Sequence, residues 1–158
     1  MAEGRSIQRL IARAIASERP VAVDASAVLE FLINPGDSAQ FVQQMFEDER
    51  LSILLSTVTI SESLVRPARR NDLDGVIAIK RSLEQRPRTI VVPFDGEQAI
   101  ETAIVRAQTN LKLPDSAVIA AARTHRAIGI VGADRKWLTR ELGVPFYYLP
   151  DIQEAERG

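Results

Sequence analysis

Four acidic residues that lie far apart in the chain stand where an apolar segment ends or a helix is expected to begin: Asp24, Glu62, Asp115 and Asp134. Asp24 closes a short apolar run, and Asp134 follows another apolar run and the turn formed by Gly132 and its neighbour. Carboxylates that folding gathers at one point repel one another unless a cation lies between them. The sequence therefore predicts a site for a divalent cation.

Glu62 and Asp115 are expected on helices that carry apolar stripes. Helical spacing places Glu62 between Val58 at i−4 and Val65 at i+3, so we expect it to share the inward face of its helix. Asp115 is followed at i+3 by Val118, which again puts an acid next to an apolar stripe. Both helices could then bring their carboxylates toward the sheet edge where Asp24 is expected.

A structural explanation competes for two of these acids. Asp is a favoured N-cap and is stabilised in a first helical turn, so Asp115 or Asp134 taken alone could serve only to start a helix. Asp24 is harder to explain as a cap, because Asp is depleted in strands and is costly beside a buried one. A mid-helix Glu62 on an apolar face also needs a partner. All four together favour a functional cluster.

The remaining composition restricts which cation could bind. The chain has no cysteine and a single histidine, His125, so Cys-based zinc sites, disulfides, thiolate nucleophiles and His clusters are excluded. His125 lies late in a helical pattern between arginines, which favours a surface position. Oxygen donors alone suit hard cations, so Mg²⁺ or Mn²⁺ is the expected cofactor.

Length and charge are those of one ordinary globular domain. The chain has 158 residues, of which 46% are hydrophobic and 26% charged, with a net charge of −1. No apolar run approaches the roughly 20 residues of a membrane span, and the first residues lack the apolar stretch of a signal peptide. We therefore expect a cytoplasmic protein that has no membrane partner.

Strand-like and helical patterns alternate along the chain. Strands are expected at 21–23, 52–55, 89–92, 128–131 and 146–148, and helices at 26–33, 38–48, 58–69, 73–85, 97–109, 115–126 and 136–142. This alternation predicts an α/β fold with three layers and a central, mainly parallel sheet of about five strands. Residues 1–20 are expected to form an amphipathic helical extension, 21–150 the domain and 151–158 a C-terminal tail. In such a sheet, ligands bind beyond the carboxyl ends of the strands.

Four segments carry a resemblance to a known family. In order and rough spacing they are VAVDASAV at 21–28, TISE at 59–62, LKLPDSAVIAAA at 111–122 and GADR at 132–135. Together they resemble the signatures of PIN-domain ribonucleases, and the most similar subgroup is the VapC-type toxins. The resemblance extends over about 21–149 and implies a PIN-like α/β/α fold.

The resemblance also implies an activity and a role for each acid. It implies a metal-dependent endoribonuclease, the toxin of a type II toxin–antitoxin system, that forms homodimers and is inhibited by a cognate antitoxin. Asp24 and Asp115 would be direct metal ligands, Glu62 a ligand or a base that orients water, and Asp134 an outer or second-metal ligand. Ser26 matches the family's Ser/Thr position near the first acid. Its alternative role is a local hydrogen bond at a helix start.

One position departs from the family pattern. Gly132 stands two residues before the fourth acid, where the family often has Thr, Ser or Asn, so a polar contact is expected to be missing. A catalytically silent RNA- or protein-binding module is therefore an alternative. A metal-dependent phosphatase is another, although Ser26 stands where the second acid of an Asp-x-Asp pair would be.

The net charge of −1 does not attract negatively charged RNA. An RNA substrate would therefore need positive charge near the site. Two groups could supply it: Arg66, Arg69 and Arg70 after Glu62, and Arg135 and Lys136 after Asp134. Any one of these residues could equally be a solubilising surface residue.

The aromatic residues near the end of the chain are expected to pack rather than to stack on bases. They are Trp137, Phe146, Tyr147 and Tyr148. All four lie in or near the last strand, and aromatic side chains contribute heavily to protein cores.

Overall fold

Five short parallel strands form one sheet in the computed structural model, which describes residues 7–33 and 37–152. The strands are β1 (Val21–Val23), β2 (Ile53–Ser56), β3 (Thr89–Val92), β4 (Gly129–Gly132) and β5 (Phe146–Tyr148). Their order in the sheet is β3-β2-β1-β4-β5, and every neighbouring pair is parallel. The strands β2 and β3 lie on one side of β1, and β4 and β5 lie on the other. The boundary between β1 and β4 is therefore the topological switch point of the sheet.

The strands separate two hydrophobic cores. In β1, Val21 and Val23 face one core while Ala22 faces the other. The same alternation places Ile130 and Val131 of β4 in opposite cores. Because all of these side chains are buried, both faces of the sheet must be covered by helices, as a parallel sheet requires.

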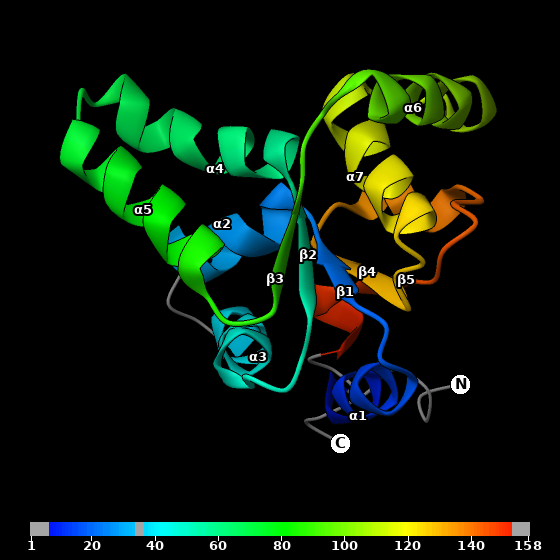
Figure 1. The fold of residues 1–158 in the computed structure, drawn as a ribbon, viewed down its shortest axis with the longest axis horizontal. Helices are drawn as coiled ribbons and strands as arrows, with labels where there is room; N and C mark the ends of the chain where they lie inside the picture. Colours follow the sequence, from blue (N-terminus) through cyan, green and yellow to red (C-terminus); the bar gives the residue numbers. More distant parts are fainter. Residues whose placement is uncertain (1–6, 34–36, 153–158) are drawn as a thin grey trace.

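Helices cover both faces (Figure 1). The first core contains residues of α1 (Ile7–Ser17), α2 (Ala25–Ile33) and α3 (Asp37–Glu47), with contributions from α4 (Thr57–Arg69) and α5 (Leu73–Gln85). The second core contains residues of α6 (Gly96–Thr109), α7 (Leu113–Thr124) and the 3₁₀ helix η2 (Arg135–Thr139). The described residues therefore form the expected α/β/α arrangement.

Side-chain caps start several helices directly after a strand or turn. Ser56, the last residue of β2, accepts a hydrogen bond from the Val58 amide at the start of α4. Asp72 and Asp95 accept from Gly75 and Gln98 and so begin α5 and α6. Each cap satisfies an amide that the helix leaves free, and together they fix where each helix leaves the sheet.

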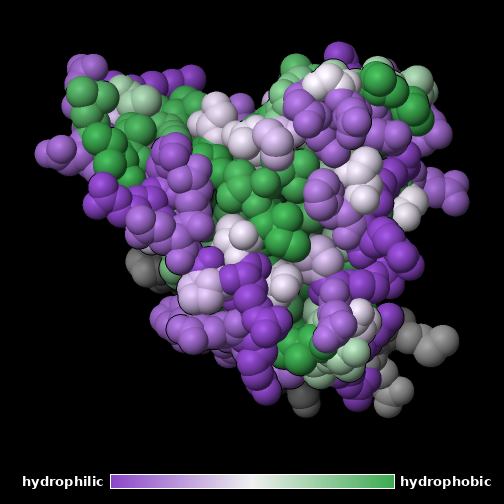
Figure 2. Space-filling model, viewed as in Figure 1, coloured by the Kyte–Doolittle hydropathy of each residue, from purple (hydrophilic) through white to green (hydrophobic). Residues whose placement is uncertain are grey.

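The helical pairs α4–α5 and α6–α7 form two arms that diverge from each other, and α7 of the second arm packs on the sheet (Figure 1). Figure 2 shows that the surface is hollowed between them. Hydrophobic residues remain exposed on both arms, including Leu73 and Ile77 of α5 and Ile100 of α6. Glu62 lies on α4 of the first arm and Asp115 on α7 of the second.

The helix α1 packs on the domain's own core. Its apolar face, Ile7, Leu10, Ile11 and Ala14, is buried in the first core. Ile152, beyond β5, is buried in the same core. The described part of the predicted N-terminal extension and the start of the predicted tail thus contribute to folding, while residues 1–6 and 153–158 lie outside the described residues.

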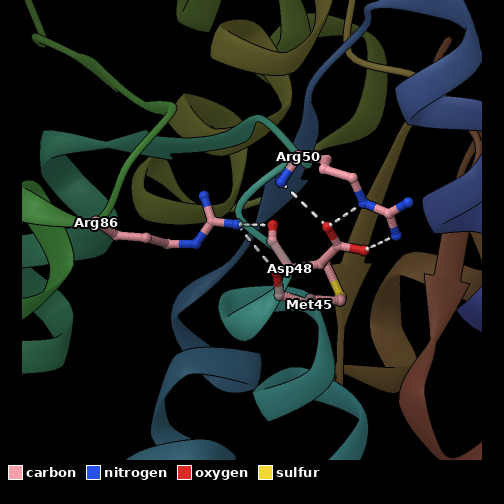
Figure 3. A network of polar contacts seen from close by, with 4 residues as sticks. All are labelled: Met45, Asp48, Arg50 and Arg86. Carbon is pink, nitrogen blue, oxygen red and sulfur yellow. Dashed lines mark hydrogen bonds and ion pairs between the residues drawn. The ribbon is translucent and has the colours of Figure 1, made fainter.

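Arg86 ties the end of α5 to the end of α3 (Figure 3). Its guanidinium donates hydrogen bonds to the carbonyl oxygens of Met45, Phe46 and Asp48, at distances of 3.1, 2.7 and 2.7 Å. The Asp48 carboxylate accepts from the Arg50 side chain at 2.7 and 2.9 Å. These charged donors satisfy carbonyls that end α3 and fix the connection into β2.

Most sequence-based elements are confirmed within one or two residues, and β1, β3, β5 and α5 have the predicted bounds. The predicted helix at 136–142 is wrong: only the short 3₁₀ helix η2 forms there. Gly132 is the last residue of β4 rather than part of a turn. No helix in the described ranges is long and apolar enough to cross a membrane.

Candidate active site

Asp24 lies at the carboxyl end of β1, at the switch point of the sheet. Its backbone amide donates to the Val131 carbonyl of β4 at 3.1 Å, which fixes the residue beside the neighbouring strand. The residue is only 4% exposed. The β1 strand therefore delivers a buried carboxylate to the crevice where ligands bind in open parallel sheets.

Two hydrogen bonds hold the Asp24 carboxylate in place. Its Oδ1 accepts from the Ser26 hydroxyl at 2.6 Å and from the Ala27 amide at 3.1 Å. The second bond is an N-cap of α2, so the expectation that Asp24 is hard to explain as a cap is wrong: it caps a helix and also lines the pocket. Both bonds end at Oδ1, so they leave Oδ2 available for a cation.

Ser26 connects two strand ends. Its hydroxyl donates to Asp24 and accepts from the Ala133 amide at 2.8 Å, just beyond β4. The hydrogen bond at a helix start and the contact with the first acid are therefore the same interaction. The hydroxyl fixes the Asp24 carboxylate relative to the segment that carries Asp134.

Gly132 leaves space for the Asp24 carboxylate. A Cβ atom at position 132 would lie 2.8 Å from Oδ1 and 2.9 Å from Cγ of Asp24. A larger residue would therefore push the carboxylate away or move β4. The departure from the family pattern thus has a steric reason in this chain, and Ser26 supplies a polar contact to the same acid.

Burial dominates the electrostatics of Asp24. Loss of solvent raises the pKa of Asp24 to about 6, against the hydrogen bonds from Ser26 and Ala27, which lower it. The negative charges of Asp115 and Asp134 raise this pKa further. The three carboxylate charges repel one another. Protonation of a carboxylate or binding of a cation would therefore reduce this repulsion.

Asp115 and Asp134 share a lysine. The Lys136 ammonium lies 3.3 Å from Oδ2 of Asp134 and 4.0 Å from Oδ2 of Asp115. Burial raises the pKa of the Asp115 carboxyl; the Lys136 charge opposes this shift, and the Asp134 charge adds to it. Lys136 is thus a counter-ion for two of the acids, although it was predicted as an RNA contact.

The capping explanation applies to one of these two acids. Asp134 is the N-cap of η2 and accepts from the Lys136 amide at 3.0 Å. Asp115 stands in the first turn of α7, whose N-cap residue is Lys112. Asp115 is therefore not the cap of its helix, and its carboxylate remains free of that role.

Glu62 is exposed, so the expectation that it shares an inward, apolar face is wrong. Its neighbour Val65 is 37% exposed and lines a groove between α4 and α5, and Val58 is only half-buried. The buried side of the helix carries Thr59 and Ser63 instead. The hydroxyl of Thr59 is buried beside the acids and has no hydrogen-bond partner among the described residues.

One pocket of about 210 Å³ unites the predicted site. Its lining includes all four acids and Ser26, together with Thr59. The side chains come from β1, α2, α4, α7 and the loop after β4, as predicted from the sheet edge. Within 7–33 and 37–152, however, no three His, Cys, Asp or Glu side chains are placed closely enough to hold a metal ion together.

The family model of the PIN domain matches residues 21–140. The chain belongs to the PIN domain family. The match includes every predicted catalytic residue, from Asp24 to Asp134. A search of curated proteins gave no significant match.

Solved structures share this fold at low sequence identity. VapBC2 from Rickettsia felis, bound to a DNA fragment from its promoter, has a TM-score of 0.61 at 11% identity and covers 80% of this chain and 96% of its own. A toxin–antitoxin complex from Klebsiella pneumoniae has a TM-score of 0.58 at 14% identity, covering 75% and 91%. The sarcin–ricin loop cleaving toxin VapC20 from Mycobacterium tuberculosis has a TM-score of 0.57 at 10% identity, covering 72% and 89%.

The donor set of this PIN domain fits a hard divalent cation. Every candidate ligand is a carboxylate oxygen, and three of the acids already repel one another in the pocket. Lys136 supplies part of the missing positive charge. A cation would therefore take over from a partial counter-ion and pull the carboxylates closer to one another.

The predicted RNA-binding arginines divide by position. Arg66 and Arg70 line a second pocket of about 470 Å³ whose wall includes Leu29, which also lines the acidic pocket. Arg69 and Arg135 are exposed outside both pockets. Arg66 and Arg70 thus line a pocket that adjoins the acidic pocket at Leu29, whereas Lys136 pairs with Asp115 and Asp134.

The four aromatic residues pack as expected. Trp137 is buried in the second core against Phe146, and Phe146 contacts Tyr148. Tyr147 is buried in the first core. Sequence analysis missed a consequence of this packing, which is that the Trp137 indole N–H affects Asp115.

Proposed function

We propose that the protein is a metal-dependent endoribonuclease that acts as the toxin of a toxin–antitoxin pair. The observation that carries this proposal is the gathering of four acids from separate elements into one pocket at the switch point of a PIN domain. The raised pKa values of Asp24 and Asp115 support it, because groups with shifted pKa values that share a crevice are candidates for a functional site.

Each acid has a proposed role. Asp24 and Asp115 would hold the metal directly, and Asp134 would be an outer or second-metal ligand. A divalent ion, Mg²⁺ or Mn²⁺, would polarise the scissile phosphate and lower the pKa of a nucleophilic water. The exposed carboxylate of Glu62 is accessible to solvent, which suits a base that orients water better than a buried ligand.

The substrate would approach over α4. Arg66 and Arg70 can contact the phosphates of a strand whose scissile bond lies in the acidic pocket, since the two pockets share Leu29. Arg69 and Arg135 would extend this contact. The VapC20 toxin, named for cleaving the sarcin–ricin loop, supports structured RNA as the substrate class.

Partners follow from the same similarity. The fold is that of proteins solved in toxin–antitoxin complexes, which supports a cognate antitoxin for this chain. The exposed hydrophobic residues on both arms, including Leu73 and Ile100, are compatible with protein contacts such as a homodimer. A cytoplasmic location is part of this proposal.

Cleavage of a structured RNA by the purified protein tests the proposal. We expect cleavage with Mg²⁺ or Mn²⁺, none with EDTA, and a loss of at least about 100-fold in rate for Asp24→Asn and Asp115→Asn, since both remove charge from the reacting centre. Cleavage that survives EDTA and both substitutions would refute the proposal.

Two other acids provide matched controls. Asp95 caps α6 as Asp24 caps α2, and Asp74 lies in the first turn of α5 as Asp115 lies in that of α7. Asp95→Asn and Asp74→Asn should leave the cleavage rate unchanged. A similar loss in these variants would mean that helix initiation, and not the pocket, explains the effect.

The spacing of the acids favours one alternative. Among residues 7–33 and 37–152 no three acids are placed to hold a metal together, so a silent RNA-binding module is the second candidate. Tight RNA binding that is insensitive to EDTA and accompanied by no cleavage would favour this second function.

A further inference from the structure

The second pocket, of about 470 Å³, adjoins the acidic pocket, and the two share the side chain of Leu29. Residues on or next to α2, α4 and α5 line it. Sites that enclose a small organic molecule usually measure roughly 300–1,000 Å³, a range that includes this pocket and excludes the acidic pocket of about 210 Å³. A ligand whose phosphate enters the acidic pocket must therefore place its larger groups beside that pocket.

The wall formed by α2 and α5 is apolar. Leu29, Leu32 and Ile33 stand at i, i+3 and i+4, so they lie on one face of α2, and Ile79 of α5 lines the same pocket. Leu32 is 36% exposed, and the other three side chains are half-buried. The core of the domain therefore leaves apolar surface here that a ligand can cover.

The wall formed by α4 is cationic. Arg66 stands four residues after Glu62, and Arg70, the C-cap residue of α4, stands four residues after Arg66, so the three lie along one side of the helix. Within residues 7–33 and 37–152, neither guanidinium has a hydrogen bond or an ion pair. The Asp72 carboxylate, which also lines the pocket, caps α5 by accepting from the Gly75 amide at 2.9 Å. Both positive charges are thus available to an anionic ligand.

We propose that this second pocket binds one unpaired ribonucleotide next to the scissile phosphate, with its base against the apolar wall and its phosphate at Arg66 and Arg70. The inference rests on the proposed ribonuclease function and adds a fixed position at which the RNA must be single-stranded. A base within a duplex is stacked between its neighbours and cannot enter a pocket. An unstacked base can pack against apolar side chains or guanidinium planes.

The chemistry of the pocket favours a nucleotide over an acidic protein segment. The apolar wall and the two guanidiniums lie within one pocket, so its ligand needs an apolar surface and an anion close together. A single nucleotide has both, whereas a peptide would need separate apolar and acidic side chains. The shared Leu29 also places this ligand next to the acids that are proposed to act on a phosphate.

Nucleoside 5′-monophosphates test the pocket separately from cleavage, because they contain no bond between nucleotides. In protein with ¹³C-labelled methyl groups and with EDTA present, at least one of AMP, GMP, CMP and UMP should shift the methyl resonances of Leu32 and Ile79. The Ile77 resonance, from an exposed residue of the same helix α5, should not shift. Absence of these shifts with all four nucleotides, or equal shifts with ribose 5-phosphate, which has no base, would overturn the inference.

Variants of each wall test the two contacts. Arg70→Ala should weaken binding of the monophosphate about 10-fold, since it removes a charged contact to the phosphate. Leu32→Ala should weaken it about 3-fold by removing apolar surface. Arg81→Ala and Ile77→Ala change exposed residues of α5 outside the pocket and should bind as wild type. Equal affinity in all four variants would mean that the nucleotide binds elsewhere.

An RNA that the protein cleaves tests the position of the base. Replacing its nucleotides one at a time by abasic residues should slow cleavage about 10-fold at one position next to the scissile bond, where the contact of the base is lost. In Leu32→Ala the same abasic residue should have a smaller effect, because part of that contact is already missing. An unchanged effect in this variant would contradict the proposed placement of the base.

Failure of the inference and failure of the proposed function give different results. If RNA is cleaved but no nucleotide shifts Leu32 or Ile79, the ribonuclease proposal stands and the base pocket does not. If the nucleotides bind as expected but no RNA is cleaved with Mg²⁺ or Mn²⁺, the pocket stands and the ribonuclease proposal falls. If a peptide of alternating leucine and glutamate shifts these methyl groups and the nucleotides do not, the pocket binds a protein segment and the inference is wrong.

Discussion

Asp24 and Asp48 both lie where a strand and a helix meet, yet their surroundings shift their pKa values in opposite directions. Burial raises the pKa of Asp24 to about 6, and neighbouring acids add to the rise. Hydrogen bonds from the Arg50 side chain lower the pKa of Asp48, which is half-buried. The surroundings of Asp48 therefore favour its charged form, whereas those of Asp24 favour its protonated, neutral form.

The same contrast extends to the groups around each acid. At the Asp48 connection, Arg86 satisfies three carbonyls, and the Asp48 carboxylate has the Arg50 side chain as its partner (Figure 3). In the acidic pocket, the buried Thr59 hydroxyl has no partner among the described residues, and three carboxylates repel one another. Carboxylates that repel one another within a shared pocket indicate a site kept for a ligand.

The largest expected effect is on the stability of the metal-free protein. Because folding raises the pKa of Asp24 from 3.8 to about 6, the folded state favours the protonated acid, and the stability that this provides is lost as pH rises from 3.8 through 6. The loss is on the order of 3 kcal/mol at neutral pH. Asp24→Asn should therefore unfold at higher urea concentration than wild type at about pH 8 in EDTA.

The pH dependence of this difference distinguishes electrostatics from packing. The gap between Asp24→Asn and wild type should narrow as the pH falls below 6 and close near the unperturbed value of 3.8. A gap that is constant with pH would contradict the account. Adding Mg²⁺ should stabilise the wild type and leave the variant unchanged, if the cation binds only the charged site.

Removal of the Arg86 side chain should destabilise the protein, whereas Asp24→Asn should stabilise it. Arg86→Ala removes the charged donors of four carbonyl oxygens, three of them at the end of α3, and should cost about 2 kcal/mol in the free energy of unfolding, measured by urea denaturation. Arg81→Ala, an exposed arginine on the same helix α5, is the control and should cost little. RNA cleavage by folded Arg86→Ala should equal that of wild type. A specific loss of cleavage would mean that this network also serves the site.

The smallest expected effect concerns the clearance around Asp24. Gly132→Ala would bring a Cβ to 2.8 Å from the carboxylate and should weaken Mg²⁺ or Mn²⁺ binding about 10-fold by displacing it. In Gly96→Ala the new Cβ meets no atom within 4 Å, so this variant controls for the loss of glycine. Equal metal affinity in both variants would show that Asp24 adjusts freely.

The sequence predicted the elements that a local pattern determines. The strand 21–23 and the helix 73–85 were found with their bounds because apolar runs, and the caps that flank them, lie within a few residues. The gathering of Asp24, Glu62, Asp115 and Asp134 in one pocket also followed from the rule that parallel strands present their carboxyl ends at one edge. Their detailed roles as ligands stay a prediction.

Other features depend on contacts between residues that are far apart in the sequence, which a local sequence pattern does not reveal. Helical spacing predicted Glu62 on the inward face of its helix, but the buried side of α4 carries Thr59 and Ser63, so Glu62 is exposed. Gly132 was predicted in a turn because glycine is common there, whereas it is a strand residue whose missing side chain accommodates the distant Asp24. The influence of Trp137 on Asp115 likewise requires knowledge of which side of the ring faces α7.

The burial of α1 sets the limits of the unit that can fold. The family match begins at residue 21 and ends at 140, yet Ile7, Leu10, Tyr147, Leu149 and Ile152 occupy one continuous core with β1. A fragment trimmed to the matched boundaries would expose that apolar surface on two sides and lose an edge strand. The boundaries of the family match mark the part of the fold that the family shares, and independent folding needs the flanking segments as well.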